Sequence, residues 1–237
     1  MESDDNEVQC DGANGDDETN GDNQHSQERT LPEKITNVER SAATRKKVLK
    51  ATISCLNDLG YEGTTVIKVA LEAGVSRGAA QHQFPSKTDL IIAAAEFIVE
   101  SQSKMRETMW DSLISEKESL SAIVDFSWSL QSHPDNIALL EIMMATRNNV
   151  DLRTRFAPFF EHFIQLRYFG AEKITQAIGG KEVDPELVAL LRLHFSVMRG
   201  LALDALVTTD TDGIDAAIEL LKQHELEVLR KIIAKHA

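Results

Sequence analysis

Apolar residues recur every three or four positions along most of the chain beyond residue 40, which is the pattern of amphipathic helices. The first such stretch runs from about Ser41 or Thr44 to Leu59, and Gly60 follows it as a stop signal. A second long helix is expected to open at the capping pair Ser86 and Asp89 and to continue to about Met109. The pattern predicts further helices over residues 119–132, 135–147, 151–178, 184–208 and 212–235. We therefore expect an all-α protein.

Residues 64–84 contain two shorter helical patterns joined by a tight turn. The hydroxyls of Thr65 and Ser76 are placed to cap the two helices by accepting a backbone N–H. Gly74 lies between them, where a helix commonly ends on a residue with positive φ. This arrangement is typical of a helix-turn-helix, whose second helix enters the major groove of DNA. An ordinary αα-hairpin in a helical bundle has the same spacing, so the pattern by itself leaves both interpretations open.

Composition narrows the class of protein. The chain has 237 residues, only 5 prolines and 12 glycines, and no apolar run near 18 residues, so we expect no membrane span. The start of the sequence lacks the pattern of a signal peptide, and two cysteines suggest no disulfide framework, so we expect a cytoplasmic protein. There is no glycine-rich phosphate loop, no metal-ligand spacing and no nucleophile motif, so we expect neither an enzyme nor a cofactor or metal.

The net charge of −13 is unevenly distributed. Residues 1–29 carry ten acidic residues and one basic residue, whereas residues 34–87 carry nine basic residues against four acidic ones. Local charge sets affinity for phosphate, so the basic segment fits a DNA partner despite the net charge. Residues 1–38 are expected to be a disordered acidic tail, because they have almost no apolar residues to bury. The tail either aids solubility or mimics DNA phosphate and competes for the basic segment.

Residues 45–97 resemble the DNA-binding domain of the TetR family of bacterial transcriptional regulators. The matching positions are Leu59-Gly60-Tyr61, Gly63-Thr64-Thr65, Val69-Ala70, Ala73-Gly74-Val75-Ser76, Gly78, His82 and Phe84-Pro85-Ser86-Lys87-Thr88-Asp89-Leu90. The chain departs from the family where Ala80-Gln81 replaces a common Leu-Tyr pair and where Gln83 precedes the aromatic residue. The operator sequence therefore cannot be copied from relatives.

The resemblance implies a set of DNA contacts: Thr65, Lys68, Arg77, Gly78, Ala79, Gln81, His82 and Lys87. Arg77 is expected to read guanine and Gln81 to read an adenine edge or a phosphate. Gly78 and Ala79 would let the helix lie close to the bases, while Thr65, Lys68, His82 and Lys87 would hold the backbone. Val75 and Phe84 are interpreted as core.

The second half of the chain is expected to bind an effector and to dimerise, as the resemblance implies. Two wide apolar faces, on residues 184–208 and 212–235, would pair across a two-fold axis, although both helices could instead complete the core of one protomer. Candidate pocket residues are Phe126, Met143, Met144, Arg147, Phe159, Phe160, Phe163, His194 and Met198. Met and Phe at helical spacing are also ordinary core residues. Arg147 and His194 are the polar groups, and Arg147 would anchor an anionic ligand or simply cap a helix end.

We therefore divide the chain into the tail (residues 1–38), a three-helix helix-turn-helix DNA-binding domain (39–101) and a helical effector-binding and dimerisation bundle (102–237). The predicted function is a sequence-specific DNA-binding regulator, a repressor released from a palindromic operator by a small, largely apolar effector. Two alternatives are a DNA-binding co-regulator without a small-molecule ligand and, with no motif in its favour, a helical enzyme.

Overall fold

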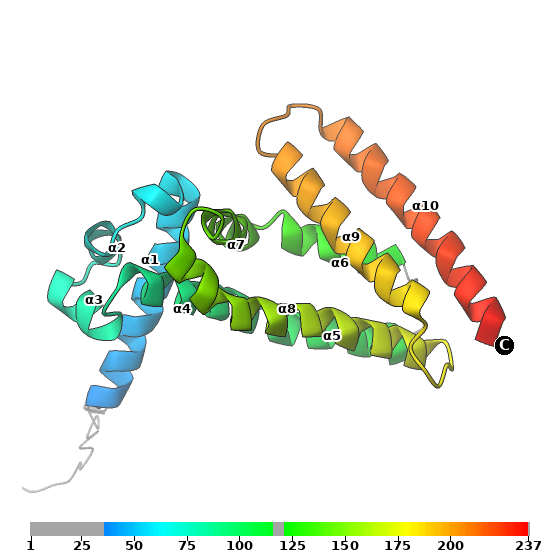
Figure 1. Ribbon diagram of the computed structural model, residues 1–237, viewed down its shortest axis with the longest axis horizontal. Helices are drawn as coiled ribbons and strands as arrows, with labels where there is room; N and C mark the ends of the chain where they lie inside the picture. The colour runs from blue at the N-terminus through cyan, green and yellow to red at the C-terminus, as the bar shows by residue number, and fades with distance from the viewer. Residues whose placement is uncertain (1–35, 116–120, 237) are drawn as a thin grey trace, which may run out of the picture. The chain divides into compact units, whose positions relative to one another are not determined.

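The computed structural model describes residues 36–115 and 121–236, and every regular element in these ranges is an α-helix. The all-α prediction is therefore confirmed (Figure 1). In chain order the helices are α1 (Asn37–Gly63), α2 (Val66–Glu72), α3 (Arg77–Gln83), α4 (Lys87–Ser101), α5 (Ser103–Ser115), α6 (Ser121–Gln131), α7 (Pro134–Ala145), α8 (Val150–Ala177), α9 (Pro185–Asp204) and α10 (Thr211–His236). The predicted tail lies outside the described residues up to position 35.

Helix α1 begins earlier than the apolar pattern predicts. Thr36 caps it, accepting from the backbone N–H of Glu39 at 3.2 Å, and the Glu39 carboxylate accepts from the Thr36 N–H at 2.7 Å. This capping box satisfies two backbone donors at once, so the helix starts at Asn37 rather than at Ser41 or Thr44. The predicted stop is confirmed, because Gly60 has φ 66° and interrupts the helical geometry.

The single helix predicted from Ser86 to Met109 is wrong, because the structure divides it at Gln102. The Arg106 guanidinium folds back across this break, donating to the backbone carbonyl of Val99 and, at 3.3 Å, to Oε1 of Gln102. A side chain thus stabilises the C-terminal end of α4 from within α5. No Gly or Pro stands at the break, so the local sequence contains no signal for it.

One hydrophobic core joins α1–α4 to α7 and the first half of α8. Buried side chains from α7 and α8 enter it beside those of the first four helices, and they are Ala138, Leu139, Ile142, Leu152, Phe156 and Phe159. Tyr61 adds polar links, since its N–H donates to Glu141 at 3.3 Å and its hydroxyl accepts from the Asn149 amide at 3.0 Å. The residues from Thr36 onward form one compact unit, so the predicted division at residue 101 stays a prediction.

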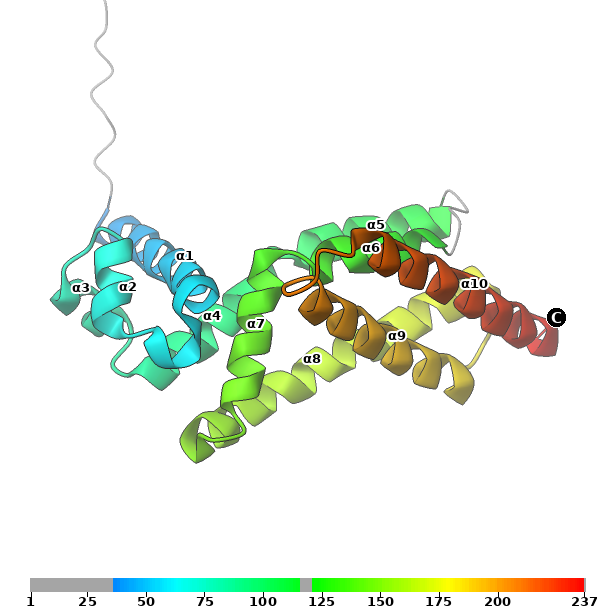
Figure 2. The same ribbon diagram turned by 90° about the horizontal axis from the view of Figure 1, so that it is seen from above.

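Two smaller apolar clusters hold the later helices together. One joins α5, α6, α8, α9 and α10 around Trp110, Ile174 and Leu187, and the other joins α6, α9 and α10 around Val124, Met198 and Ile218. Helices α9 and α10 lie side by side in both views (Figures 1 and 2). The later helices therefore form a bundle around α6, α8 and α9.

Candidate functional site

Helices α2 and α3 form the predicted helix-turn-helix. The Thr65 hydroxyl caps α2 by accepting from the Lys68 N–H at 3.3 Å, and the Ser76 hydroxyl caps α3 by accepting from the Ala79 N–H at 3.1 Å. In the turn, Gly74 has φ 64°, and the following Val75 N–H donates to the Ala70 carbonyl at 3.0 Å. Glycine suits that position because a side chain makes positive φ unfavourable. The caps and the turn glycine confirm the pattern read from the sequence.

Helix α3 buries one side and exposes the other. Ala80 and Phe84 are buried in the core with α1, and Ala80 is only 1% exposed, so a larger side chain has no room at this position. Successive residues of a helix are about 100° apart, and this places Arg77, Gly78, Gln81 and His82 on one continuous arc. All four are exposed and Ala79 is partly buried beside them. Burial of Ala80 thus gives a packing reason for one departure from the family pattern.

Basic side chains of α1 lie alongside α3. The Arg45 guanidinium lies 4.6 Å from the centroid of the Phe84 ring, and the Gln83 amide donates to the Ser41 hydroxyl at 2.8 Å. These contacts fix the N-terminal half of α1 next to α3. The exposed basic residues there are Arg40, Arg45, Lys46, Lys47 and Lys50. Thr65 and Lys68 of α2 are also exposed, so this end of the protein presents a positive surface.

Lys87 is half-buried and bonds to another part of the protein. Its ammonium donates to the Tyr61 carbonyl at 2.6 Å and lies 4.0 Å from the centroid of the Tyr61 ring. Burial lowers the pKa of this ammonium. The contact ties the start of α4 to the end of α1. A phosphate contact by Lys87 stays a prediction, and it would have to use the remaining donors of the same group.

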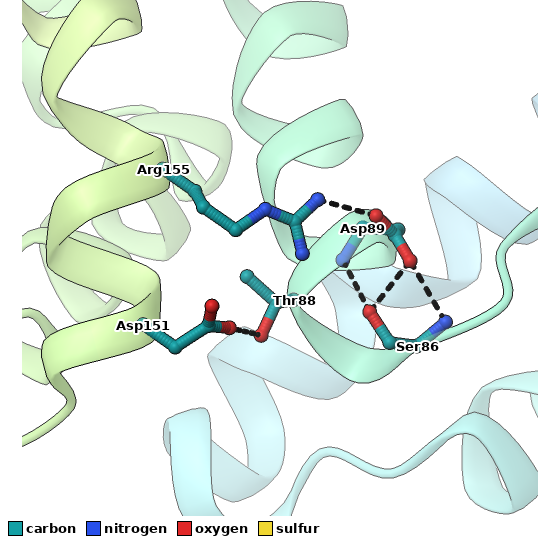
Figure 3. Close-up of polar contacts among 5 residues, drawn as sticks. All are labelled: Ser86, Thr88, Asp89, Asp151 and Arg155. Carbon is teal, nitrogen blue, oxygen red and sulfur yellow. Dashed lines mark hydrogen bonds and ion pairs between the residues drawn. The ribbon is translucent and has the colours of Figure 1, made fainter.

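A polar network fastens the first turn of α4 to the first turns of α8 (Figure 3). The Ser86 hydroxyl accepts from the Asp89 N–H at 3.1 Å, and the Asp89 carboxylate accepts from the Ser86 N–H at 3.0 Å. Arg155 of α8 donates to the other oxygen of the same carboxylate, and Thr88 donates to Asp151 at 2.9 Å. The Ser86 hydroxyl, followed by Arg155, holds the pKa of Asp89 below its usual value. We call these five residues the α4–α8 contact.

The later helices enclose a small cavity of about 70 Å³ between α5, α6, α8 and α9. Its apolar lining combines aromatic and aliphatic side chains, and its members include Met109, Trp110, Phe126, Phe163, Leu191 and Phe195. Its polar lining comes from α5, α6, α7 and the α4–α5 break, and it consists of Gln102, Arg106, Ser127, Gln131 and Asn136. Apolar walls with a few convergent polar groups are typical of small-molecule sites, although such sites usually measure about 300–1,000 Å³.

Known proteins resemble this chain in both sequence and fold. Residues 48–94 match the family described as bacterial regulatory proteins, tetR family. The regulator CymR of Pseudomonas putida is 25% identical over 206 residues, which cover 86% of this chain and 98% of CymR. The repressor AcnR of Corynebacterium diphtheriae is 25% identical over 195 residues, covering 80% of this chain and 94% of AcnR. The chain belongs to the TetR family.

Structural similarity extends beyond the matched segment. The transcriptional regulator FadR of Bacillus subtilis, solved in complex with stearoyl-CoA, superposes with a TM-score of 0.56 at 19% identity, covering 74% of this chain and 96% of FadR. The relatives are regulators, and this TetR-family chain is likewise a transcriptional regulator rather than an enzyme. In the ranges that the structure describes, no helix combines the length and the apolar character needed to span a bilayer, and no group of three metal-ligating side chains gathers.

Only some of the residues predicted to form a pocket line the cavity. Phe126 and Phe163 line it. Met143, Phe159 and Phe160 pack instead in or against the core around α1–α4, and Met198 is buried in the cluster of α6, α9 and α10. Met144 is 62% exposed and Arg147 is exposed as well, so the interpretation of Arg147 as an anchor within the bundle is wrong. Both lie where α7 ends, and the apolar pattern cannot distinguish this end from the interior.

His194 is paired rather than open to the cavity. Its Nδ1 lies 2.8 Å from the Glu225 carboxylate, and both residues are buried between α9 and α10. Its Nε2 is buried with no hydrogen-bond partner among the described residues. None of the polar residues at the cavity is predicted from the sequence, and the charged one among them is Arg106. Its only local signal is a basic residue on the inner face of α5, and such residues are common on solvated helix faces.

Proposed function

We propose that this TetR-family regulator is a repressor that binds a palindromic operator as a homodimer and leaves it when a small effector binds. The observation that carries the proposal is the exposed face of α3, held by buried Ala80 and Phe84 and bordered by the basic side of α1. A rigid helix with one buried side and one exposed polar side can lie in a major groove without unfolding.

The exposed face offers two kinds of contact. Arg77 and Gln81 carry the side chains that pair in bidentate fashion with guanine and adenine edges, so they are the proposed base readers. Gly78 and Ala79 leave room for the helix to approach the bases. Thr65, Lys68, His82 and Lys87, with the basic residues of α1, would neutralise phosphates and set the register.

Helices α9 and α10 are the proposed dimer interface. Exposed residues recur along α9 and the turn that follows at alternating spacings of four and three, and they are Ala189, Leu193, Ser196, Gly200, Leu203 and Val207. Small residues in such a stripe allow two helices to approach closely, and the exposed leucines would be buried between them. A two-fold axis through this face would present two recognition helices to sites about 34 Å apart on DNA.

Effector control is supported by the cavity and by a structural neighbour solved with stearoyl-CoA. Repression, as opposed to activation, is supported by the relative AcnR, a transcriptional repressor. The cavity is small, at about 70 Å³, which favours the alternative of a co-regulator without a ligand for the conformation described. Its polar lining favours a ligand site that enlarges on binding, and we adopt this interpretation.

Genomic footprinting with the purified protein tests the proposal. The expected result is a small number of palindromic sites in promoters, bound by two protomers each. Binding spread along DNA in proportion to length would support an architectural role and refute the repressor function. Reporter transcription from a recovered site then separates repression from activation.

A further inference from the structure

Arg106 stands between the cavity and the protein surface. It lines the cavity, and it also lines an open groove outside, beside Val99, Glu100 and Ser103. Its guanidinium is committed to two acceptors at the α4–α5 break, the Val99 carbonyl and Gln102 Oε1. Both acceptors are neutral, so the positive charge has hydrogen bonds and no paired anion among the described residues.

The surroundings of Arg106 favour an anion from inside the cavity. Burial lowers the pKa of the guanidinium, and Glu107, its neighbour in sequence, opposes that effect. Arginine stays protonated in spite of such a shift. No acidic side chain occurs among the described residues that line the cavity, and Gln131 and Asn136 add amide groups to its wall. A charge held partly out of water by neutral groups gains most from a carboxylate that can accept two parallel N–H bonds.

Because the cavity is small, binding of a ligand there requires a change in the structure. The cavity, at about 70 Å³, is about half the size of an apolar cavity of about 150 Å³ that holds benzene. A compound with one aromatic ring therefore cannot enter unless side chains such as Trp110, Phe126 or Phe163 move. Such a ligand binds the enlarged conformation far better than the one described, and this difference is what shifts a conformational equilibrium.

We propose that the effector is a compact monocarboxylate with an apolar body. Its carboxylate binds the Arg106 guanidinium, which then no longer donates to the end of α4. The inference rests on the proposed function, because it names the ligand class of the proposed effector site. When the guanidinium turns to the ligand, the Val99 carbonyl loses its side-chain donor and the C-terminal end of α4 is released from α5. The other end of α4 begins at Lys87, three residues after Phe84, and is fastened to α8 by Asp89 and Thr88, so displacement of α4 changes the position of α3.

The experiment compares matched acids and amides, which differ in charge and hardly in shape. The probes are benzoate with benzamide and phenylacetate with phenylacetamide. Fluorescence anisotropy measures their effect on binding to a recovered operator, and thermal shift measures their binding without DNA. For the natural protein we expect each acid to act at concentrations at least tenfold lower than its amide, in both measurements.

Three variants locate the effect. Arg106→Gln should remove the difference between acid and amide, while Arg106→Lys, which keeps the charge but loses the planar pair of donors, should keep a reduced difference. Arg147→Gln is the matched control, since Arg147 is exposed at the end of α7, and it should behave as the natural protein does. Circular dichroism checks that each variant keeps its helices.

The inference is overturned if acids are no more potent than their amides, or if Arg106→Gln still prefers the acids. Release of the operator by a neutral or cationic compound would also overturn it, and would leave the proposed function standing. If no specific operator is found, the proposed function fails, and the thermal-shift comparison still decides whether the cavity selects carboxylates.

Discussion

Replacing Arg155 tests how strongly α8 holds the first turn of α4. The change Arg155→Gln removes the ion pair with Asp89 and leaves the Ser86 cap in place. The side chains of Arg155 and Asp89 are 41% and 32% exposed, so solvent screens the pair and we expect a loss of only about 0.5–1 kcal/mol in the free energy of unfolding. Asp89→Ala removes the capping carboxylate as well as the pair, so it should cost about 1.5–2 kcal/mol.

The double variant separates the two effects. If the pair is real in solution, Arg155→Gln should cost about 0.5 kcal/mol less when Asp89 is already alanine, and this difference should shrink in 1 M salt. Urea denaturation at one fixed protomer concentration provides the measurement, because association also adds stability. Arg153→Gln, an exposed arginine on the same helix, is the control and should show no dependence on Asp89. An equal cost of Arg155→Gln in both backgrounds would refute the reasoning.

The same contact should be sensitive to acid. The pKa of Asp89 is held below its ordinary value of 3.8 in the folded protein, so its contribution to stability is present above that value. It is lost as the pH falls through the lowered pKa. The difference in stability between the natural protein and Asp89→Ala should therefore be constant near neutral pH and decline below about pH 4. A difference that does not change down to pH 2.5 would contradict the assigned cause.

Four further substitutions test DNA binding and assembly. Arg77→Ala should weaken binding to the operator by about 1–3 kcal/mol and relax the preference at one base position, whereas Lys68→Ala should weaken binding to all sequences and reduce the salt slope by about one unit. Equal losses on operator and random DNA for Arg77→Ala would contradict its role in reading a base. Gly78→Ala should raise the free energy of unfolding by about 0.5–1 kcal/mol, since alanine favours the helix and the nearest atom to the new methyl, Ser76 Oγ, is 4.0 Å away. The same variant should bind the operator more weakly in anisotropy measurements, and unchanged binding would show that the glycine serves no close approach to bases. Leu203→Glu places a charge in the exposed stripe of α9, so sedimentation should detect monomers and operator affinity should fall at least tenfold, whereas an unchanged mass would exclude this face as the interface.

The elements with local signals were predictable from the sequence. Helix boundaries follow from apolar periodicity and from residues that act on their own neighbours, such as Thr65, Ser76 and Gly74. The early start of α1 also has a local signal, because Thr36 and Glu39 have capping-box spacing. The apolar pattern does not reveal this start, because the surrounding segment is polar and resembles the tail.

The features that lacked a local signal were not predictable. Asp89 and Arg155 are 66 positions apart, and many other acidic and basic residues offer equally plausible partners. The break at Gln102 depends on where the Arg106 guanidinium lies, which the order of residues alone does not specify. Periodicity identifies the inward face of a helix but not what packs against it, so it cannot show that Arg147 lies exposed at the end of α7.

The shared core around α1–α4 restricts how this protein can be recombined with others. A hybrid regulator would join the DNA-binding helices of one protein to the effector-binding helices of another, with the junction after α4. Here a junction after α4 would replace Ala138, Leu139 and Ile142, which share the core with α1, by residues of the other protein, and any mismatch in shape would open a gap or cause a clash. A working hybrid would have to take α7 and the first half of α8 from the same protein as α1–α4. The exchangeable unit is therefore discontinuous in the sequence.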